Sequence, residues 1–364
     1  MPSLSEALGA YPAPLRSSHI DFDSVQKVPD SHNWPRSGEY PSCDLVGDSV
    51  PIIDMVDPDV VSHMGHACEK WGVFQIINHG VPMSLLQKVE SQAQRLFSLP
   101  IEQKLKGIRG SDQTGYGIPP VSSFYSKYMW AEGFTIVKSP VDSVRRIWPD
   151  GYQEFCDVME EYKKEMRLLA TKLLWVMLAS LGITKDNVPW VGSTGELEKA
   201  AIALQMNWYP VCPEPDRCMG LVEHTDSPLI TILLQSSNIS GLEILLEDNG
   251  QPKWVTVHPI DGALAVNVGD LLHVFTNGRF KSVLHRVLVN HTRPRFSIAH
   301  FLGPPTGAPI SPCPKLVGPD RPPLYGSVTW DEYISVKAKR HNEALSSIRL
   351  PASPLKDHNL VEAI

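Results

Sequence analysis

The chain has 364 residues, of which 42% are hydrophobic, and a formal net charge of -7 at pH 7. A chain of this size can bury a large core, and its length alone allows one or two domains. The acidic balance and the absence of any basic run argue against nucleic acid as the main partner. A small acidic substrate would therefore need positive groups gathered locally at its binding site.

No segment is typical of secretion or membrane insertion. The stretch MPSLSEALGAYPAPLR lacks a charged region followed by an apolar one, which a secretory signal requires. The longest apolar candidate, residues 168–181, contains Lys172 and is shorter than the roughly 18 residues that a membrane helix needs. The six cysteines form no close metal-binding pairs, which favours reduced thiols. We therefore expect a cytoplasmic protein with no membrane partner.

The first part of the chain predicts an irregular arm followed by short strands and helices. Residues 1–47 are rich in Pro, Ser and Asp with little periodicity, which is typical of such an arm. The apolar run PIIDM at 51–55 predicts a short strand. We further expect a helix at 57–71 with Asp57 as its candidate N-cap, a strand at 73–77 and a helix at 84–97.

A long amphipathic helix is predicted at 152–181. Apolar residues recur near helical spacing through this segment, and Gly182 follows as a stop signal. A stripe of this kind normally packs against a sheet, so we interpret the helix as scaffold that braces the β-rich part of the chain. The stripe comprises Phe155, Met159, Tyr162, Met166, Leu169, Leu173 and Val176.

From residue 200 to 302 the pattern changes to short β-rich runs separated by turn signals such as Asp261-Gly262 and Asn277-Gly278. About eight such strands are consistent with a double-stranded β-helix, or jelly roll, which can hold a ligand cavity. A final helix is predicted at 327–347, for which packing is the preferred role over that of a lid, and the residues beyond Pro351 are expected to fray. The expected fold class is thus mixed α+β.

His224, Asp226 and His285 form the strongest candidate for a metal site. In a strand, side chains two apart leave on the same face, so His224 and Asp226 can converge while Thr225 points away. His285 lies in a second β-rich run and would complete the site from another strand. Two imidazoles and one carboxylate leave three octahedral positions open, as non-haem Fe(II) oxygenases require, whereas a structural zinc site is closed.

Arg295 and Ser297 supply a candidate grip for a carboxylate. They lie two apart in the strand-like run PRFSIAHFL and therefore share a face. Arginine suits this task because its planar fork binds a carboxylate through two bonds and stays charged. Taken singly, Arg295 is more simply a surface ion pair and His285 a core histidine. All five residues in this order favour an oxygen-activating site with an acid cosubstrate.

Five segments of the chain match, in order, characteristic segments of a known family: WGVFQIINHGVP (71–82), QMNWYPVCPEPD (205–216), LVEHTDS (221–227), VNVGDL (266–271) and residues 282–297. Through them the chain resembles the plant 2-oxoglutarate and Fe(II)-dependent dioxygenases over nearly its whole length, which implies a jelly-roll fold. We accordingly expect an irregular arm at 1–47, a helix-rich N-terminal part at 48–199, a jelly-roll catalytic core at 200–305, and a C-terminal helix and tail at 306–364.

The resemblance also implies roles for the candidate residues. His224, Asp226 and His285 are expected to bind Fe(II), and Arg295 with Ser297 the distal carboxylate of 2-oxoglutarate. The implied cosubstrates are 2-oxoglutarate and O₂, with ascorbate as an expected stimulant. No catalytic residue is expected beyond the metal centre, because the cofactor carries the chemistry and the protein supplies positioning and dryness.

Asn207 and Tyr209, in the run NWYP, match positions that help to orient the cosubstrate in this family. They are two apart in a strand-like run, so both can reach inward.

A narrower likeness, to the gibberellin 3-oxidases of higher plants, is carried by the segments GYGIPPVSSFYSKYMWAEGFTI, NGRFKSVLHRVLVNHTRPRFS and PPLYGSVTWDEY. It implies 3-beta-hydroxylation of C19 gibberellin precursors to bioactive gibberellins by a monomer that acts on this small-molecule substrate.

Three alternatives remain open. A sister dioxygenase acting on another gibberellin carbon or on a flavonoid would share every residue named above. A non-catalytic small-molecule receptor on the same fold would be free to lose a ligand or the arginine, and this chain keeps all five. A metal-binding β-sandwich that uses Zn²⁺ or Mn²⁺ would stay active without 2-oxoglutarate.

The substrate pocket is expected to combine apolar walls with few polar anchors, because the gibberellin skeleton is rigid, apolar and carboxylated. A buried structural turn with an exposed lysine explains the candidate residues equally well, and the paired Arg145 and Arg146 are more typical of a solvated face. The wall candidates are Phe124, Tyr125, Met129 and Trp130, with Lys127 as the candidate anchor.

Overall fold

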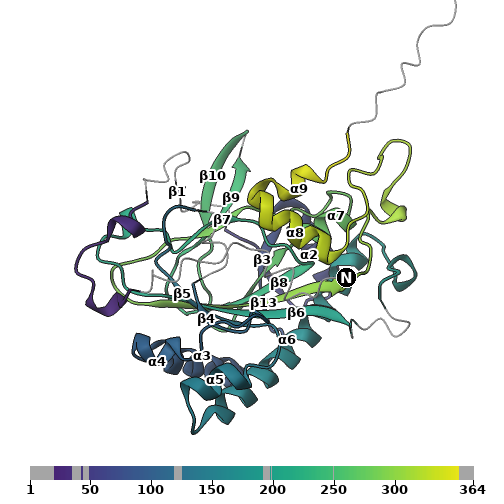
Figure 1. Ribbon diagram of the computed structural model, residues 1–364. Coiled ribbons are helices and arrows are strands. Elements are labelled where there is room, and N and C mark those ends of the chain that lie inside the picture. Colours follow the sequence, from purple (N-terminus) through teal and green to yellow (C-terminus); the bar gives the residue numbers. More distant parts are fainter. Residues whose placement is uncertain are drawn as a thin grey trace, which may run out of the picture.

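In a computed structural model, the strands of the described residues form two sheets (Figure 1). A cavity lies between them. The structure describes residues 20–34, 42–43, 49–118, 125–191, 197, 199–248 and 250–351. Residues of both sheets line the cavity. The predicted α+β class with a jelly-roll core is confirmed.

The major sheet of the described residues is antiparallel except for one parallel pair at its edge, β2 with β3. Its longest pairing joins β13 to β6, and β13 is also paired with β8 on its other side. In spatial order the strands are β2 (Ile52–Asp54), β3 (Val73–Ile77), β11 (Leu264–Val268), β8 (Ile230–Gln235), β13 (Arg295–Pro305), β6 (Ala200–Tyr209), β5 (Glu132–Ile136) and β4 (Gly115–Gly117).

The minor sheet is smaller, and its strands are short. In spatial order it contains β1 (Ser42–Cys43), β10 (Gln251–Thr256), β9 (Leu242–Asp248), β12 (His285–Val287) and β7 (Leu221–His224). The predicted strand around His285 is therefore confirmed but spans only three residues.

Strand β13 shows how the alternation of side chains separates the core from the cavity. Phe296, Ile298 and His300 belong to the face that packs on the helices, and all three are buried. Ser297 and Ala299, on the opposite face, line the cavity. Successive side chains of a strand point to opposite faces, so one strand serves both purposes.

Helices α3, α4, α5 and α6 cover the outer face of the major sheet (Figure 1). Helix α6 buries the predicted stripe from Phe155 to Leu173 and ends before Gly182, whose φ of 66° suits glycine at a helix C-terminus. The helices are α2 (Val60–Lys70), α3 (Met83–Phe97), α4 (Ile101–Leu105), α5 (Val141–Ile147), α6 (Tyr152–Ser180), α7 (Asp270–Phe275), α8 (Trp330–Arg340) and α9 (Ala344–Ser347).

Two predicted helix boundaries are wrong. Helix α2 begins at Val60, with Asp59 at the N-cap position in place of Asp57. Asp57 precedes a proline, which disfavours helical backbone, and its carboxylate instead accepts a bond from the Asp59 amide at 2.8 Å. The final α-helix ends at Arg340, where His341 has a φ of 47°, and the chain continues through a 3₁₀ turn, His341–Glu343, into the short helix α9.

The irregular arm expected at residues 1–47 stays a prediction, because the structure describes only part of it. Residues 20–34 contain two short 3₁₀ turns, Phe22–Ser24 and Asp30–His32. Trp34 Nε1 donates to Tyr128 O at 2.8 Å, which fastens this segment to the body of the protein. Residues 1–19, 35–41 and 44–48, and the tail from 352, lie outside the described residues.

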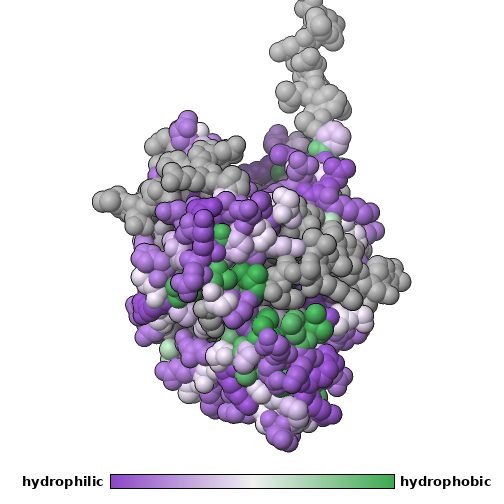
Figure 2. Space-filling model, turned by 60° about the vertical axis from the view of Figure 1, so that its left-hand side comes forward, coloured by the Kyte–Doolittle hydropathy of each residue, from purple (hydrophilic) through white to green (hydrophobic). Residues whose placement is uncertain are grey.

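The surface view in Figure 2 is largely hydrophilic, with small separate hydrophobic areas. Among the described residues, none of the helices has the length and apolar character needed to cross a membrane. The described thiols of Cys68, Cys156, Cys212, Cys218 and Cys313 are free, as predicted.

His300 is a testable weak point of the core. Both of its ring nitrogens are buried and have no hydrogen-bond partner among the described residues. Burial lowers the pKa of His300 from 6.5 to about 3. The unfolded chain therefore binds a proton below pH 6.5 that the folded protein excludes, and the protein loses stability as the pH falls through this window.

We expect His300→Phe to raise the free energy of unfolding, by about 1–3 kcal/mol at pH 8 because two unsatisfied polar atoms disappear. The gain should grow by roughly 2 kcal/mol at pH 5. Urea unfolding at both pH values measures it, with His66→Gln, at an exposed position of α2, as the control. A gain that is equal at the two pH values would contradict the buried, neutral state of His300.

Candidate metal centre

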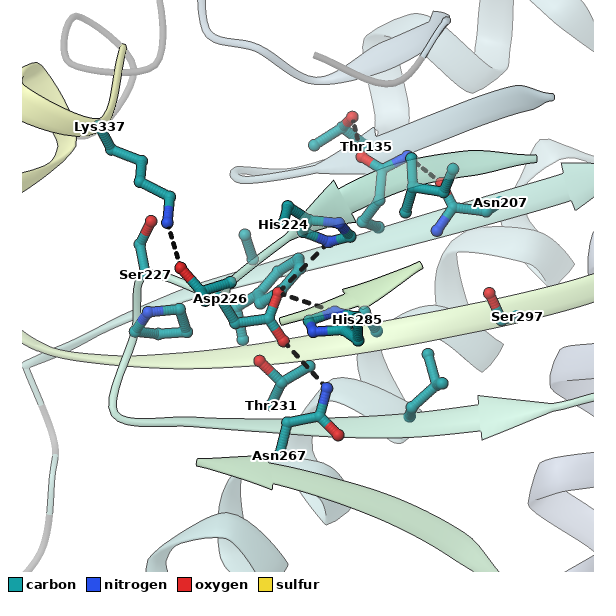
Figure 3. Close-up of a pocket in the computed structure, with 18 of the residues that line it drawn as sticks. Thr135, Asn207, His224, Asp226, Ser227, Thr231, Asn267, His285, Ser297 and Lys337 are labelled. Carbon is teal, nitrogen blue, oxygen red and sulfur yellow. Dashed lines mark hydrogen bonds and ion pairs between the residues drawn. The ribbon is translucent and has the colours of Figure 1, made fainter. Parts of the chain in front are cut away.

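Three side chains converge where the minor sheet meets the cavity. His285 on β12 is paired in register with His224 on β7, and their ring centroids lie 4.2 Å apart. The Oδ1 atom of Asp226 lies 3.8 Å from His224 Nε2 and 3.7 Å from His285 Nε2. One ligand atom from each residue lies within 4.8 Å of the others, which suits a shared metal ion (Figure 3).

The position of Asp226 differs from the one that the sequence predicts. Strand β7 ends at His224, so Asp226 lies on the turn that leads from the minor sheet to β8 in the major sheet. The imidazole of His224 and the carboxylate of Asp226 still converge. The path of the turn, rather than the alternation of side chains along a strand, directs the carboxylate.

Both imidazoles present the same nitrogen to the centre. His224 Nδ1 lies 2.8 Å from Val222 O, and His285 Nδ1 lies 3.2 Å from Val283 O. A carbonyl oxygen only accepts, so each Nδ1 carries the proton and donates it. Each Nε2 is then left with a lone pair that points at Asp226, which is the arrangement of metal-binding histidines.

Burial and neighbouring groups keep these residues in the protonation states that a metal ion needs. Burial lowers the pKa of His224 to about 3, and the nearby His285 acts in the same direction, so the ring stays neutral. Burial alone would raise the pKa of Asp226, but the imidazoles of His285 and His224 outweigh it and hold the pKa below its ordinary value. Asn267 Nδ2 also donates to Asp226 Oδ2 at 3.3 Å.

The turn that carries Asp226 rests on the backbone of Gly269 and Asp270. The Asp270 amide donates to Asp226 O at 2.7 Å, and the Gly269 amide donates to Leu229 O at 3.0 Å. A Cβ atom on Gly269 would lie 2.0 Å from Pro228 O. Only glycine allows this approach, which explains the glycine of the segment VNVGDL.

The Asp270 side chain holds the same turn through hydrogen bonds. This fully buried carboxylate accepts from Thr225 Oγ1 at 3.0 Å and from Ser282 Oγ at 2.6 Å. On its other side it accepts from Tyr333 OH at 2.6 Å and from Lys337 Nζ at 2.9 Å, both on helix α8. The residue between the two chain-adjacent metal ligands is thus tied to the C-terminal helix.

Four of the predicted residues form a square on β6 and β13. Tyr209 is paired with Arg295 and Asn207 with Ser297, and all four are buried on the cavity face. The Arg295 guanidinium lies 5.2 Å from the centroid of the Tyr209 ring.

Arg295 is left with donors that need an acceptor. Its Nη2 donates to Gln235 Oε1 at 2.8 Å, whereas Nε and Nη1 are buried without a hydrogen-bond partner among the described residues. Leaving such donors unpaired is costly, and a carboxylate is the acceptor that fits a planar guanidinium.

The residues fit both a ferrous ion and an acid cosubstrate. Two imidazoles and one carboxylate border a cavity of about 220 Å³ that Arg295 and Ser297 also line. The three ligands would leave coordination positions open toward the cavity, as in sites that activate oxygen. The unpaired Nε and Nη1 donors of Arg295 can bind an anion there.

Several residues of the site were not identified from the sequence. Gln205 is two positions before Asn207 and could have been found by alternation, and Asn267 and Asp270 lie in the matched segment VNVGDL. Arg109 and Lys337 also line the cavity, and no local pattern marks them.

The predicted substrate wall is wrong for the described residues. Trp130 packs edge-on against Phe22, and Lys127 Nζ donates to Asp30 O at 2.7 Å, away from the cavity. Met129 is buried but does not line the cavity, and Tyr125 packs edge-on against Trp34 and against His341, of which only His341 lines the cavity. Phe124 lies outside the described residues. Arg145 and Arg146 are exposed on helix α5, as the solvated-face interpretation predicts.

Comparison with known families supports the chemistry of the site. Residues 201–304 match the 2OG-Fe(II) oxygenase superfamily, and residues 50–151 match the N-terminal model described as non-haem dioxygenase in morphine synthesis. Gibberellin 3-beta-dioxygenase 1 of Pisum sativum is 50% identical, over 99% of this chain and 97% of that protein. Gibberellin 3-beta-dioxygenase 1 of Arabidopsis thaliana is 48% identical, over 95% and 98%.

Solved structures share the fold. JOX2 in complex with 2OG, Fe and JA has a TM-score of 0.77 and 29% identity, covering 90% of this chain and 95% of its own. The dioxygenase for auxin oxidation in rice has a TM-score of 0.68 and 26% identity, covering 83% and 100%. The chain therefore belongs to the gibberellin 3-beta-dioxygenase family within the 2OG-Fe(II) oxygenase superfamily, and it is a 2-oxoglutarate-dependent dioxygenase that uses Fe(II).

Proposed function

We propose that the protein hydroxylates C-3 of C19 gibberellin precursors on the beta face and so produces bioactive gibberellins. The observation that carries this proposal is the 50% identity to the Pisum sativum gibberellin 3-beta-dioxygenase over 99% of this chain. The sister reaction at another gibberellin carbon would use the same metal and cosubstrate residues, so the product decides between the two.

In this proposal His224, Asp226 and His285 hold Fe(II). The Nδ1 bonds to backbone carbonyls fix the imidazole rings, and Asn267 fixes the carboxylate. Such outer partners orient metal ligands and raise their basicity.

The square on β6 and β13 holds 2-oxoglutarate. Arg295 and Ser297 bind its distal carboxylate, since the unpaired Nε and Nη1 atoms of Arg295 require an acceptor. Asn207 and Tyr209, on the paired strand, orient the cosubstrate beside the metal.

Iron and 2-oxoglutarate together supply the oxidation, in which O₂ is consumed, 2-oxoglutarate is decarboxylated to succinate, and an oxygen atom enters a C–H bond of the substrate. The protein positions the substrate beside the metal and keeps water away from it. Leu221, Leu233, Leu242 and Val287 line the cavity around the metal site and exclude water from the reacting carbon.

We also propose a cytoplasmic monomer that acts on a small molecule. The described cysteines are free thiols, which is typical of a reducing compartment. The face drawn in Figure 2 is largely hydrophilic and carries only small separate hydrophobic areas.

The test is product identification. Purified enzyme loaded with Fe(II) without oxygen receives 2-oxoglutarate, O₂ and a 3-deoxy C19 gibberellin, and the products are compared with standards by mass spectrometry while succinate is counted. A 3-beta-hydroxylated gibberellin with stoichiometric succinate is expected. Succinate coupled to a product hydroxylated at another carbon would overturn the assigned position of attack.

Asp226→Ala is expected to abolish turnover and to lower the iron content of the purified protein, because two imidazoles alone do not complete the site. The loss should exceed the roughly 10- to 100-fold that removal of an outer partner costs. Asp216→Ala, at an exposed position before β7, is the matched control and should keep its activity. Normal turnover by the Asp226 variant would remove this residue from the metal site.

Arg295→Lys is expected to raise the apparent KM for 2-oxoglutarate by roughly 10- to 100-fold, because lysine keeps the charge and loses the planar fork. Initial rates at varied 2-oxoglutarate measure the change. Arg293→Lys, two residues earlier and exposed, is the control. If both variants show the wild-type value, another group holds the distal carboxylate.

A further inference from the structure

The cavity continues beyond the metal centre along a row of polar side chains on β5 and β6. Asn207 Oδ1 accepts from Gln205 Nε2 at 3.1 Å, and Gln205 Oε1 accepts from Thr135 Oγ1 at 2.6 Å. Arg109 Nη2 then donates to Thr135 Oγ1 at 2.8 Å. Figure 3 shows Asn207 and Thr135 at one side of the pocket, beyond His224 as seen from Asp226. Arg109, which also lines the cavity, follows Thr135 in this row.

Arg109 is a second guanidinium on the wall of this cavity, and it has no counter-ion among the described residues. Its Nη1 donates to Ile118 O at 3.2 Å, while its Nε is buried and lacks a hydrogen-bond partner in that part of the chain. Burial lowers the pKa of Arg109 to about 10, so the group stays charged at neutral pH.

The two guanidinium groups lie too far apart to hold the same small anion. Arg295 donates to Gln235 on β8 and Arg109 donates to Thr135 on β5, and β13 and β6 lie between these strands. Thr135 is also displaced by two residues along the sheet, because it is paired with Gln205 while Gln235 lies opposite Ser297. Three strand spacings and two residues separate the backbones of Thr135 and Gln235, the residues that hold the two guanidinium groups, by roughly 16 Å.

The positive charge of Arg109 is the one on the described cavity wall that no negative charge balances once iron and 2-oxoglutarate are bound. Fe(II) brings two positive charges, Asp226 one negative, 2-oxoglutarate two negative and Arg295 one positive, so this part of the cavity is neutral. Lys337 is neutralised by Asp270 at 2.9 Å. Of the charged groups among the described lining residues, Arg109 alone lacks a partner of opposite sign.

We propose that Arg109 binds the carboxylate of the substrate, at the end of the cavity away from the 2-oxoglutarate site. This inference rests on the proposed function, in which the substrate is a gibberellin with one free carboxylate. Apolar residues that also line the cavity, among them Ala201, Ile202 and Ala203, suit the rigid skeleton. The carboxylate at Arg109 then sets which carbon faces the metal.

Gln113, on the same wall, supports a ligand site at this end. Its backbone is left-handed, with a φ of 66°. A residue other than glycine holds this conformation only when its surroundings impose it, and such residues gather at ligand sites.

The test compares a 3-deoxy C19 gibberellin with its methyl ester, which keeps the skeleton and removes the charge. We expect wild-type enzyme to favour the acid by roughly 10- to 100-fold in kcat/KM, and Arg109→Met to reduce this ratio to near unity. The affinity of the Fe(II)- and 2-oxoglutarate-loaded enzyme for the acid, measured without oxygen, should fall by a similar factor. The KM for 2-oxoglutarate should not change.

Lys127→Met removes the same charge from outside the cavity and should keep the wild-type acid-to-ester ratio. Arg109→Lys keeps the charge and should retain part of the preference, and it replaces the methionine variant if that variant does not fold. A merely structural role of Arg109 would lower the rates with acid and ester equally. Conversion of the acid with an unchanged ratio in the variant would overturn the role of Arg109, whereas no conversion of the acid by wild-type enzyme would overturn the proposed function itself.

Discussion

The register between β7 and β12 is the constraint on which the site depends. It places His285 directly opposite His224, so two of the three proposed metal ligands start from neighbouring positions of one sheet. A slip by one residue would turn an imidazole to the other face. Arg286, the next residue, points to that other face, where its Nε donates to Glu243 Oε2 at 2.8 Å. Both partners of this ion pair are buried, and such pairs favour one register over its alternatives because a slip would strand a buried charge.

The local part of this site could be predicted from the sequence, and the tertiary part could not. Alternation puts Arg295 and Ser297 on the same face of β13, and it puts Asn207 and Tyr209 on the same face of β6. The pairing of β13 with β6 then places all four residues on one face of the sheet. The convergence of His224 and Asp226 was predicted from the same rule although Asp226 lies on a turn. No periodicity describes that turn, because its path is set by a backbone contact with Gly269, distant in sequence.

The same reasoning explains why Arg109 and Lys337 were missed. Arg109 lies in a loop and meets Thr135, 26 residues later, so its direction is set by tertiary packing. Lys337 lies on an amphipathic helix, where a lysine normally faces solvent. It is buried because it forms an ion pair with Asp270, 67 residues earlier. The prediction of wall residues was wrong for a related reason, because apolar and aromatic side chains such as Trp130 can belong equally well to a core or to a cavity wall. The chemistry of an iron site restricts residue types far more than the shape of an apolar wall does.

The buried Asp270 decides the role of the C-terminal helix. A lid must leave the cavity at low cost, but movement of α8 would withdraw Tyr333 and Lys337 from a carboxylate that is fully buried. Breaking a buried ion pair by removing one partner costs about 3–5 kcal/mol. It would also free Thr225, which the same carboxylate holds between His224 and Asp226. Helix α8 is therefore a fixed support of the proposed metal ligands, which agrees with packing as its predicted role. The substrate must then enter past other elements of the cavity rim.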